Sequence, residues 1–146
     1  MLLVQIAEVL EEEIAREKLW VREWLARRST HGGSALLSKE LNAEDQAEYC
    51  AGLRMSPECF ETLHDLIANA IQRSDTLMRD AIPSRIKLEV TLSLLATGNS
   101  YRNLQHLFRV SKAAISKFIP EVCDSIYLKL GDHIKVRNIH NLFFIH

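Results

Sequence analysis

The chain has 146 residues, a formal net charge of −1 and an apolar fraction of 47%. That length allows one domain with a hydrophobic core, and that apolar fraction excludes a disordered or fibrous chain. Leu, Ala, Glu, Lys and Arg are abundant and β-branched residues are sparse, so we expect an all-α fold, a helical bundle.

Residues 2–28 are predicted to form one long amphipathic helix. Its apolar stripe repeats at heptad-like spacing and consists of Leu3, Ala7, Leu10, Ile14, Val21 and Trp24. We expect this stripe to pack on the core of the domain. The alternative is a helix reserved for a partner or a second copy, in which Trp20 and Trp24 provide the partner-binding surface.

Residues 30–34 contain two glycines and indicate a break, and residues 34–53 predict a short helix and another after Asn42. Ser56, Pro57 and Glu58 are a strong helix start, with a capping serine, a first-turn proline and an acid near the positive end of the dipole. We expect that helix to run to about residue 72. Its buried face would be formed by Phe60, Leu63, Ile67 and Ile71.

Residues 73–82 read as a polar connector, with Pro83 and Ser84 opening the next element. Apolar and polar residues alternate over 86–94, which is a strand pattern. The same residues also form two apolar stripes on opposite sides of a helix, as expected for a helix between two layers. We predict the helix, because Leu and Lys are good helix formers and no partner strand is evident. Gly98 would end it.

The stretch Ser100 to Phe118 has the spacing of a helix-turn-helix. Ser100 would cap a helix over 101–108, Arg109 and Val110 would form the turn, and Ser111 would cap the second helix. We expect Arg109 to hold the left-handed position that glycine usually occupies. The predicted buried residues are Leu104, Leu107 and Phe108 in the first helix, Val110 in the turn, and Ile115 and Phe118 in the second helix.

A basic surface is predicted around the second helix, because residues 85–119 carry six basic side chains and one acid whereas the first 84 residues are acidic. Lys112, Ala113, Ser116 and Lys117 would face outward. The predicted DNA-contacting residues are Arg102, Arg109, Ser111, Lys112, Ser116 and Lys117, and Arg85 and Lys87 could extend the footprint. The alternative is a plain helical corner with a solvated basic edge.

Pro120 predicts that the second helix ends or kinks near Ile119, because proline lacks the N–H that would bond to Ser116. A last helix from 120 to 130 would then bury Val122, Ile126 and Leu130.

Three well-separated cysteines show neither a disulfide framework nor a zinc spacing, which favours a reducing compartment. The apolar first ten residues lack the basic start of a signal peptide, and no apolar run is long enough to span a membrane. No catalytic motif, metal-ligand spacing or small-molecule site is evident, so we expect no catalytic residues, metal ligands or cofactor. We therefore expect a soluble intracellular protein that is not an enzyme.

The runs LRMSPECFETLHDLI and DTLMRDAIPSRIKLEVTLSLLATGNSYRNLQHLFRVSKAAISKFIPEVCDSIYLKL, preceded by WVREWLARR, resemble the N-terminal region of PIF/Harbinger transposases and Harbinger-derived nucleases. The resemblance covers about residues 19–136. It implies a DNA-binding helix-turn-helix module, and the alternative it suggests is a protein-interaction module that docks a Myb-like DNA-binding partner. Both interpretations imply a nuclear protein, and the alternative location is the cytoplasm.

Members of that family carry a nuclease domain after the helical region, in which three carboxylates bind two divalent metal ions. The sequence stops where such a domain would begin, so we expect a truncated copy without catalytic carboxylates. On this basis the expected organisation is an N-terminal helical segment over 1–55, a helix-turn-helix domain over 56–136 and a divergent tail over 137–146.

Overall fold

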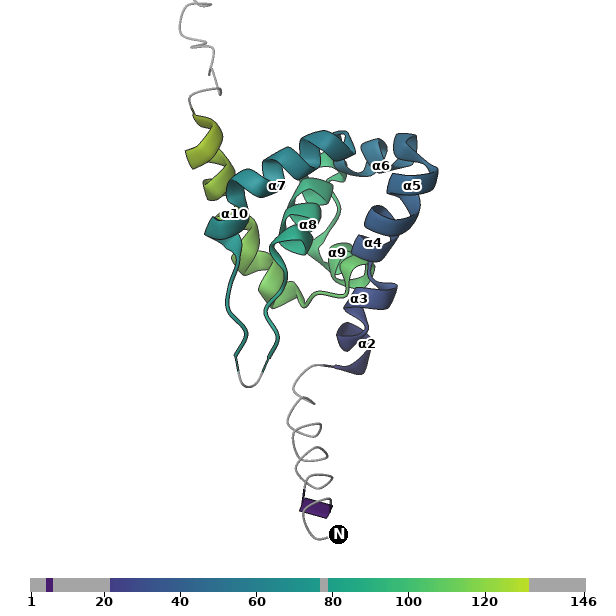
Figure 1. Ribbon diagram of the computed structural model, residues 1–146, viewed down its shortest axis with the longest axis vertical. Coiled ribbons are helices and arrows are strands. Elements are labelled where there is room, and N and C mark those ends of the chain that lie inside the picture. Colours follow the sequence, from purple (N-terminus) through teal and green to yellow (C-terminus); the bar gives the residue numbers. More distant parts are fainter. Residues whose placement is uncertain (1–4, 7–21, 77–78, 132–146) are drawn as a thin grey trace, which may run out of the picture.

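The computed structural model describes residues 5–6, 22–76 and 79–131 (Figure 1). Within these ranges every regular element is helical, apart from one isolated bridge between Thr76 and Arg79, and no helix is long and apolar enough to cross a membrane. The all-α prediction is therefore confirmed. The elements are α2 (Glu23–Ala26), α3 (Arg28–His31), α4 (Gly33–Ala35), the π-helix η2 (Leu36–Leu41), α5 (Asn42–Glu44), α6 (Gln46–Leu53), α7 (Pro57–Ile71), α8 (Ser84–Thr97), α9 (Tyr101–Phe108) and α10 (Lys112–Leu130).

Helix α8 lies at the centre of the fold, in contact with α6, α7, α9 and α10 (Figure 1). Residues 86–93 are all buried, so both apolar stripes of this helix face other helices. The alternating pattern therefore belongs to a helix packed between two layers, as predicted. Gly98 ends α8 in the left-handed conformation, with φ of +67°.

Helix α7 begins where the sequence predicted, at Pro57, and the Ser56 hydroxyl accepts a hydrogen bond from the Cys59 N–H at 3.4 Å. Phe60, Ile67 and Ile71 are fully buried, and Leu63 is partly buried. The helix ends at Ile71, and the connector that follows projects from the body as a long loop (Figure 1).

The predicted continuous helix over 2–28 is wrong in its last part. Arg22 is extended, with φ −53° and ψ 135°. Arg27, with ψ of 21°, leaves the helical conformation and separates α2 from α3. Residues 7–21, including Trp20, lie outside the described residues. From Gly33 on, α4 to α6 match the expected short helix and the helix after Asn42.

The chain between α3 and α4 passes very close to its neighbours. A Cβ on Gly32 would lie 2.5 Å from the Arg28 carbonyl oxygen, and one on Gly33 would lie 3.0 Å from Leu107 Cγ. The Gly32 contact is with its own helix α3, whereas the absence of a side chain at Gly33 lets α4 pack directly against Leu107 of α9. This contact places the N-terminal helices beside the helix-turn-helix.

Helix α10 continues through Pro120 as one element of 19 residues, so an end near Ile119 is wrong, and the alternative, a kink there, stays a prediction. The proline cannot donate a hydrogen bond to the Ser116 carbonyl. Ser116 and Pro120 are both exposed, and the unbonded carbonyl can therefore be solvated. Phe118, Ile119 and Val122 on the other side are buried and hold the helix against α7 and α8, while Ile126 and Leu130 are only partly buried.

Candidate nucleic-acid interface

Helices α9 and α10 and the turn between them have the packing of a helix-turn-helix. The five residues expected to lock the motif are almost completely buried, with exposed fractions of 0 to 3%: Leu104, Phe108, Val110, Ile115 and Phe118. Leu107, which was also expected to be buried, is 44% exposed. It points instead to the edge where Gly33 passes.

The two caps and the turn match the sequence prediction. The Ser100 hydroxyl accepts from the Asn103 N–H at 3.2 Å, and the Ser111 hydroxyl accepts from the Ala114 N–H at 3.3 Å. Arg109 is left-handed, with φ 52° and ψ 47°, a conformation that costs a non-glycine residue roughly 1–2 kcal/mol. The turn therefore contains strain that other contacts must offset.

Those contacts come from the Arg109 side chain. Its Nε donates to the His31 carbonyl at 2.9 Å and its Nη1 donates to the Trp24 carbonyl at 2.8 Å. Arg109 was expected to flank the DNA, but the structure uses these two donors to join the turn to α2 and α3. This arrangement makes it a positioning residue.

Trp24 is half-buried, and its ring stacks on the His106 ring with centroids 5.6 Å apart. The predicted partner-binding tryptophan therefore packs on α9 of its own chain. Trp20, its proposed companion, lies outside the described residues, so a docking surface formed by the two tryptophans stays a prediction.

The exposed face of α10 carries the residues that the sequence placed there. Lys112, Ala113, Ser116 and Lys117 are all exposed. The Ser116 hydroxyl donates to the Ala113 carbonyl at 3.0 Å, and its oxygen remains able to accept. Arg102 is exposed on α9. The exposed face of α10 thus combines two cations with a short polar side chain.

Hydrogen bonds within the protein engage some of the backbone N–H groups in the first turn of α10. The Lys112 N–H donates to Gln105 Oε1 at 3.1 Å, and the Ser111 cap occupies the Ala114 N–H. These bonds fix the start of α10 against α9. Ser111 therefore acts as a cap, and its hydroxyl oxygen is engaged at the helix start.

Arg85 and Lys87 do not extend the basic surface, contrary to the sequence prediction. Arg85 bonds to both Glu61 carboxylate oxygens, at 2.7 and 3.0 Å, and lies over the Phe60 ring. Lys87 is 4% exposed, and its Nζ donates to the Ile71 carbonyl at 2.6 Å. Burial lowers the pKa of Lys87. Lys87 is buried between α7 and α8, whereas Arg85 is half-buried and paired with Glu61 of α7.

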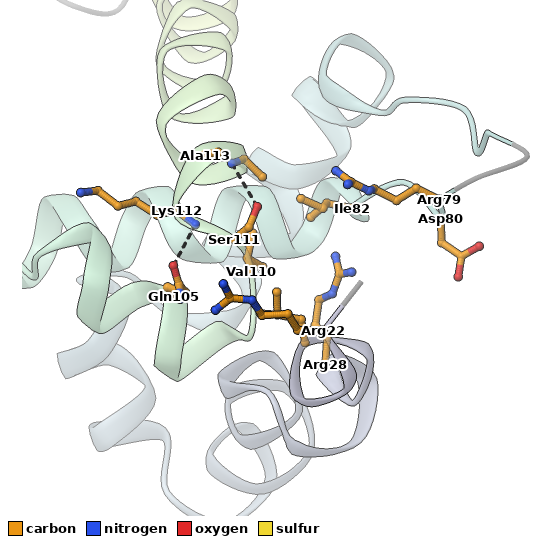
Figure 2. Close-up of a pocket in the computed structure, with 12 residues that line it drawn as sticks. Arg22, Arg28, Arg79, Asp80, Ile82, Gln105, Val110, Ser111, Lys112 and Ala113 are labelled. Carbon is orange, nitrogen blue, oxygen red and sulfur yellow. Dashed lines mark hydrogen bonds between the residues drawn. The ribbon is translucent and has the colours of Figure 1, made fainter. Parts of the chain in front are cut away.

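A cavity of about 380 Å³ opens beside the start of α10 (Figure 2). Its walls come from α2 and α3, from the connector before α8, and from the turn and first residues of α10. We call it the basic pocket, and its charged lining residues are Arg22, Arg28, Arg79, Asp80 and Lys112. The three arginines were missed in the sequence, because they lie in two segments distant from the helix-turn-helix and carry no shared local pattern.

Arg28 is the most enclosed cation of the basic pocket. Desolvation lowers the pKa of its guanidinium, and Asp80 offsets this only in part. Its Nη1 is buried and has no hydrogen-bond partner among the described residues. In Figure 2 the Arg79 side chain reaches from the connector toward Ile82, while the Lys112 side chain extends away from the arginines.

Comparison with known proteins gives no match: no family model, curated protein or solved structure is similar to this chain. The resemblance to PIF/Harbinger transposases therefore stays a prediction. Over the described residues, no three His, Cys, Asp or Glu side chains gather as a metal site would require.

Proposed function

We propose that this chain is a DNA-binding helix-turn-helix module of Harbinger type, with α10 as the helix that meets the duplex. The observation that carries the proposal is the coincidence of two features in α10. One side locks into the helix-turn-helix core through Ile115 and Phe118, and the opposite side presents Lys112, Ser116 and Lys117. A helix held this way can enter a major groove.

The chemistry of the exposed face favours binding to phosphate over reading of bases. Lys112 and Lys117 are flexible cations suited to phosphate oxygens, and such contacts give affinity that depends on salt. Ser116 is the one polar side chain between them. The module would bind and not catalyse, and DNA as its target implies a nuclear location.

The test is fluorescence anisotropy of the full chain against a random-sequence duplex at several salt concentrations. We expect binding that weakens steeply with salt. In the variant Lys112→Glu/Lys117→Glu, two phosphate contacts are lost, and the slope of log affinity against log salt should become shallower by about 1.8. Far-ultraviolet circular dichroism should be unchanged, because both side chains are exposed.

The matched control is Lys39→Glu/Lys129→Glu, which changes the net charge equally at two exposed positions outside the helix-turn-helix face. It should retain most of the affinity. Equal losses in the two double variants would mean that net charge alone drives association. Unaltered affinity in Lys112→Glu/Lys117→Glu would exclude α10 as the DNA-contacting helix.

A further inference from the structure

We propose that the basic pocket is a phosphate-binding site, and that in the proposed DNA complex it holds a backbone phosphate next to those contacted by α10. This inference rests on the proposed function for the source of the phosphate. The pocket itself is defined by the fold, because its cations come from α2, α3, the connector and α10.

The charge of the lining favours an anion. Three arginines line the cavity, Lys112 lines it with its side chain extending away from them, and Asp80 is the one acid among the lining residues. Apolar walls come from Leu25, Ile82 and Val110, and they lower the local dielectric and strengthen interactions with a bound anion. Guanidinium groups suit phosphate particularly well, since their planar donors can bond two oxygens at once.

Arg28 supplies a second, independent observation. Its Nη1 is buried without an acceptor among the described residues, so the protein leaves part of the donor capacity of this guanidinium unused. Buried polar groups are almost always hydrogen-bonded, so this nitrogen, which has no accessible surface in the free protein, gains a partner only if the Arg28 side chain turns toward an acceptor in the cavity. The partner that fits a guanidinium among other arginines is an oxyanion.

The start of α10 also favours an anion in the pocket. Residues 111–114 line the pocket, so the positive end of a 19-residue helix faces the cavity. Lys112 belongs both to this lining and to the exposed face of α10. A DNA strand lying along that face therefore passes the mouth of the pocket, and one of its phosphates can enter while its neighbours meet Lys112 and Lys117.

The first arm of the test measures the pocket without DNA. Inorganic phosphate is titrated into the isotope-labelled full chain, and amide chemical shifts are followed by NMR. We expect saturable shifts at Ala113 and Ala114, and an affinity about tenfold lower in Arg28→Gln, which loses a charge-assisted partner. Arg27→Gln is the matched control, because Arg27 is the exposed neighbour that does not line the pocket.

Arg79→Gln keeps the test valid if Arg28→Gln fails to fold. Arg79 is an exposed residue of the connector, so its replacement should leave the fold intact while weakening phosphate binding. Absence of shifts at the start of α10, or equal affinity in the Arg27 and Arg79 variants, would overturn the phosphate site.

The second arm measures binding of the random duplex by the same variants. Weaker binding and a slope shallower by about 0.9 in Arg28→Gln or Arg79→Gln, with Arg27→Gln unchanged, would support a DNA phosphate in the pocket.

If phosphate binds but these variants bind DNA normally, the DNA source is wrong and a free phosphate-bearing ligand is indicated. If DNA binds but phosphate does not, the inference fails and the proposed function stands. If phosphate binds and DNA does not, the proposed function fails and the pocket remains a phosphate site.

Discussion

Replacement of Glu89 by glutamine should stabilise the protein at alkaline pH. Glu89 lies on α8 with no exposed surface, and neither of its carboxylate oxygens has a hydrogen-bond partner of good geometry among the described residues. Arg85 Nε is 3.3 Å from Oε1. Desolvation raises the pKa of Glu89 from 4.5 to about 7, and the opposing effects of Ser34 and Arg85 are smaller.

The direction of the pH effect on stability follows from which protonation state of Glu89 the folded protein favours. A carboxyl whose pKa is raised on folding is most favourable when protonated, so its contribution is fully present below pH 4.5 and is lost as the pH rises to about 7. At pH 8 the ionised group costs about 3 kcal/mol, since each pKa unit corresponds to about 1.4 kcal/mol. Glutamine is neutral at every pH, and Glu89→Gln should recover up to that amount.

Urea unfolding of both proteins at pH 5 and pH 8 checks this expectation. The gain in the free energy of unfolding should be large at pH 8 and small at pH 5. Glu61→Gln is the control, because its hydrogen bonds with Arg85 lower the pKa of Glu61, and its stabilising effect is lost as the pH falls. That variant should therefore be less stable than wild type at pH 8. A Glu89→Gln protein that is less stable at pH 8, or a gain equal at both pH values, would refute the reasoning.

Three further substitutions test the core and a helix boundary by thermal unfolding. Leu104→Ala, at a position with no exposed surface, should cost about 2–5 kcal/mol, whereas Leu107→Ala should cost far less because that residue is 44% exposed; equal losses would contradict the packing of α9. Arg54→Gly should stabilise by about 1 kcal/mol, because Arg54 ends α6 with φ of 57° and is exposed. A loss of stability there would show that its side chain makes a contact that matters.

The helix-turn-helix could be predicted well because its determinants are local. The spacing from Leu104 to Phe118 fixes which residues face inward, and the capping serines mark both helix starts. Helix α8 was predictable by the same logic. Its alternation is compatible with a strand, but it also produces two apolar faces, and the structure buries both.

The cationic surface could be predicted only in part, because tertiary structure redistributes the charges: Lys112 and Lys117 are exposed as expected, but other cations are not where the sequence placed them. Arg85 and Lys87 belong to the basic segment of the sequence, yet the Glu61 carboxylate engages Arg85 and the buried Ile71 carbonyl engages Lys87. Arg22, Arg28 and Arg79 lie outside that segment and meet only in the folded chain. The local sequence reports charge density along the chain, whereas binding depends on which charges remain available in space.

The breaks in the N-terminal helices and the continuity of α10 also depend on distant contacts. An apolar stripe through Trp24 predicts one helix, but the helical path breaks at Arg22 and Arg27, and Arg109 bonds to the Trp24 and His31 carbonyls of this segment. Pro120 is a local helix breaker, but its exposed position lets water satisfy the carbonyl it leaves unbonded. In both cases packing outweighs local preference.

The bonds made by Arg109 have a consequence for how this sequence can diverge. Its acceptors at positions 24 and 31 are main-chain oxygens, which every amino acid provides. Substitutions at those two positions can therefore accumulate without breaking the connection, as long as the path of the backbone is kept. Position 109 has less freedom, since the planar guanidinium holds Nε and Nη1 at fixed positions that match the two oxygens, whereas lysine must bring one flexible ammonium nitrogen to both. One side chain thus lets the turn remain fixed while its neighbours vary.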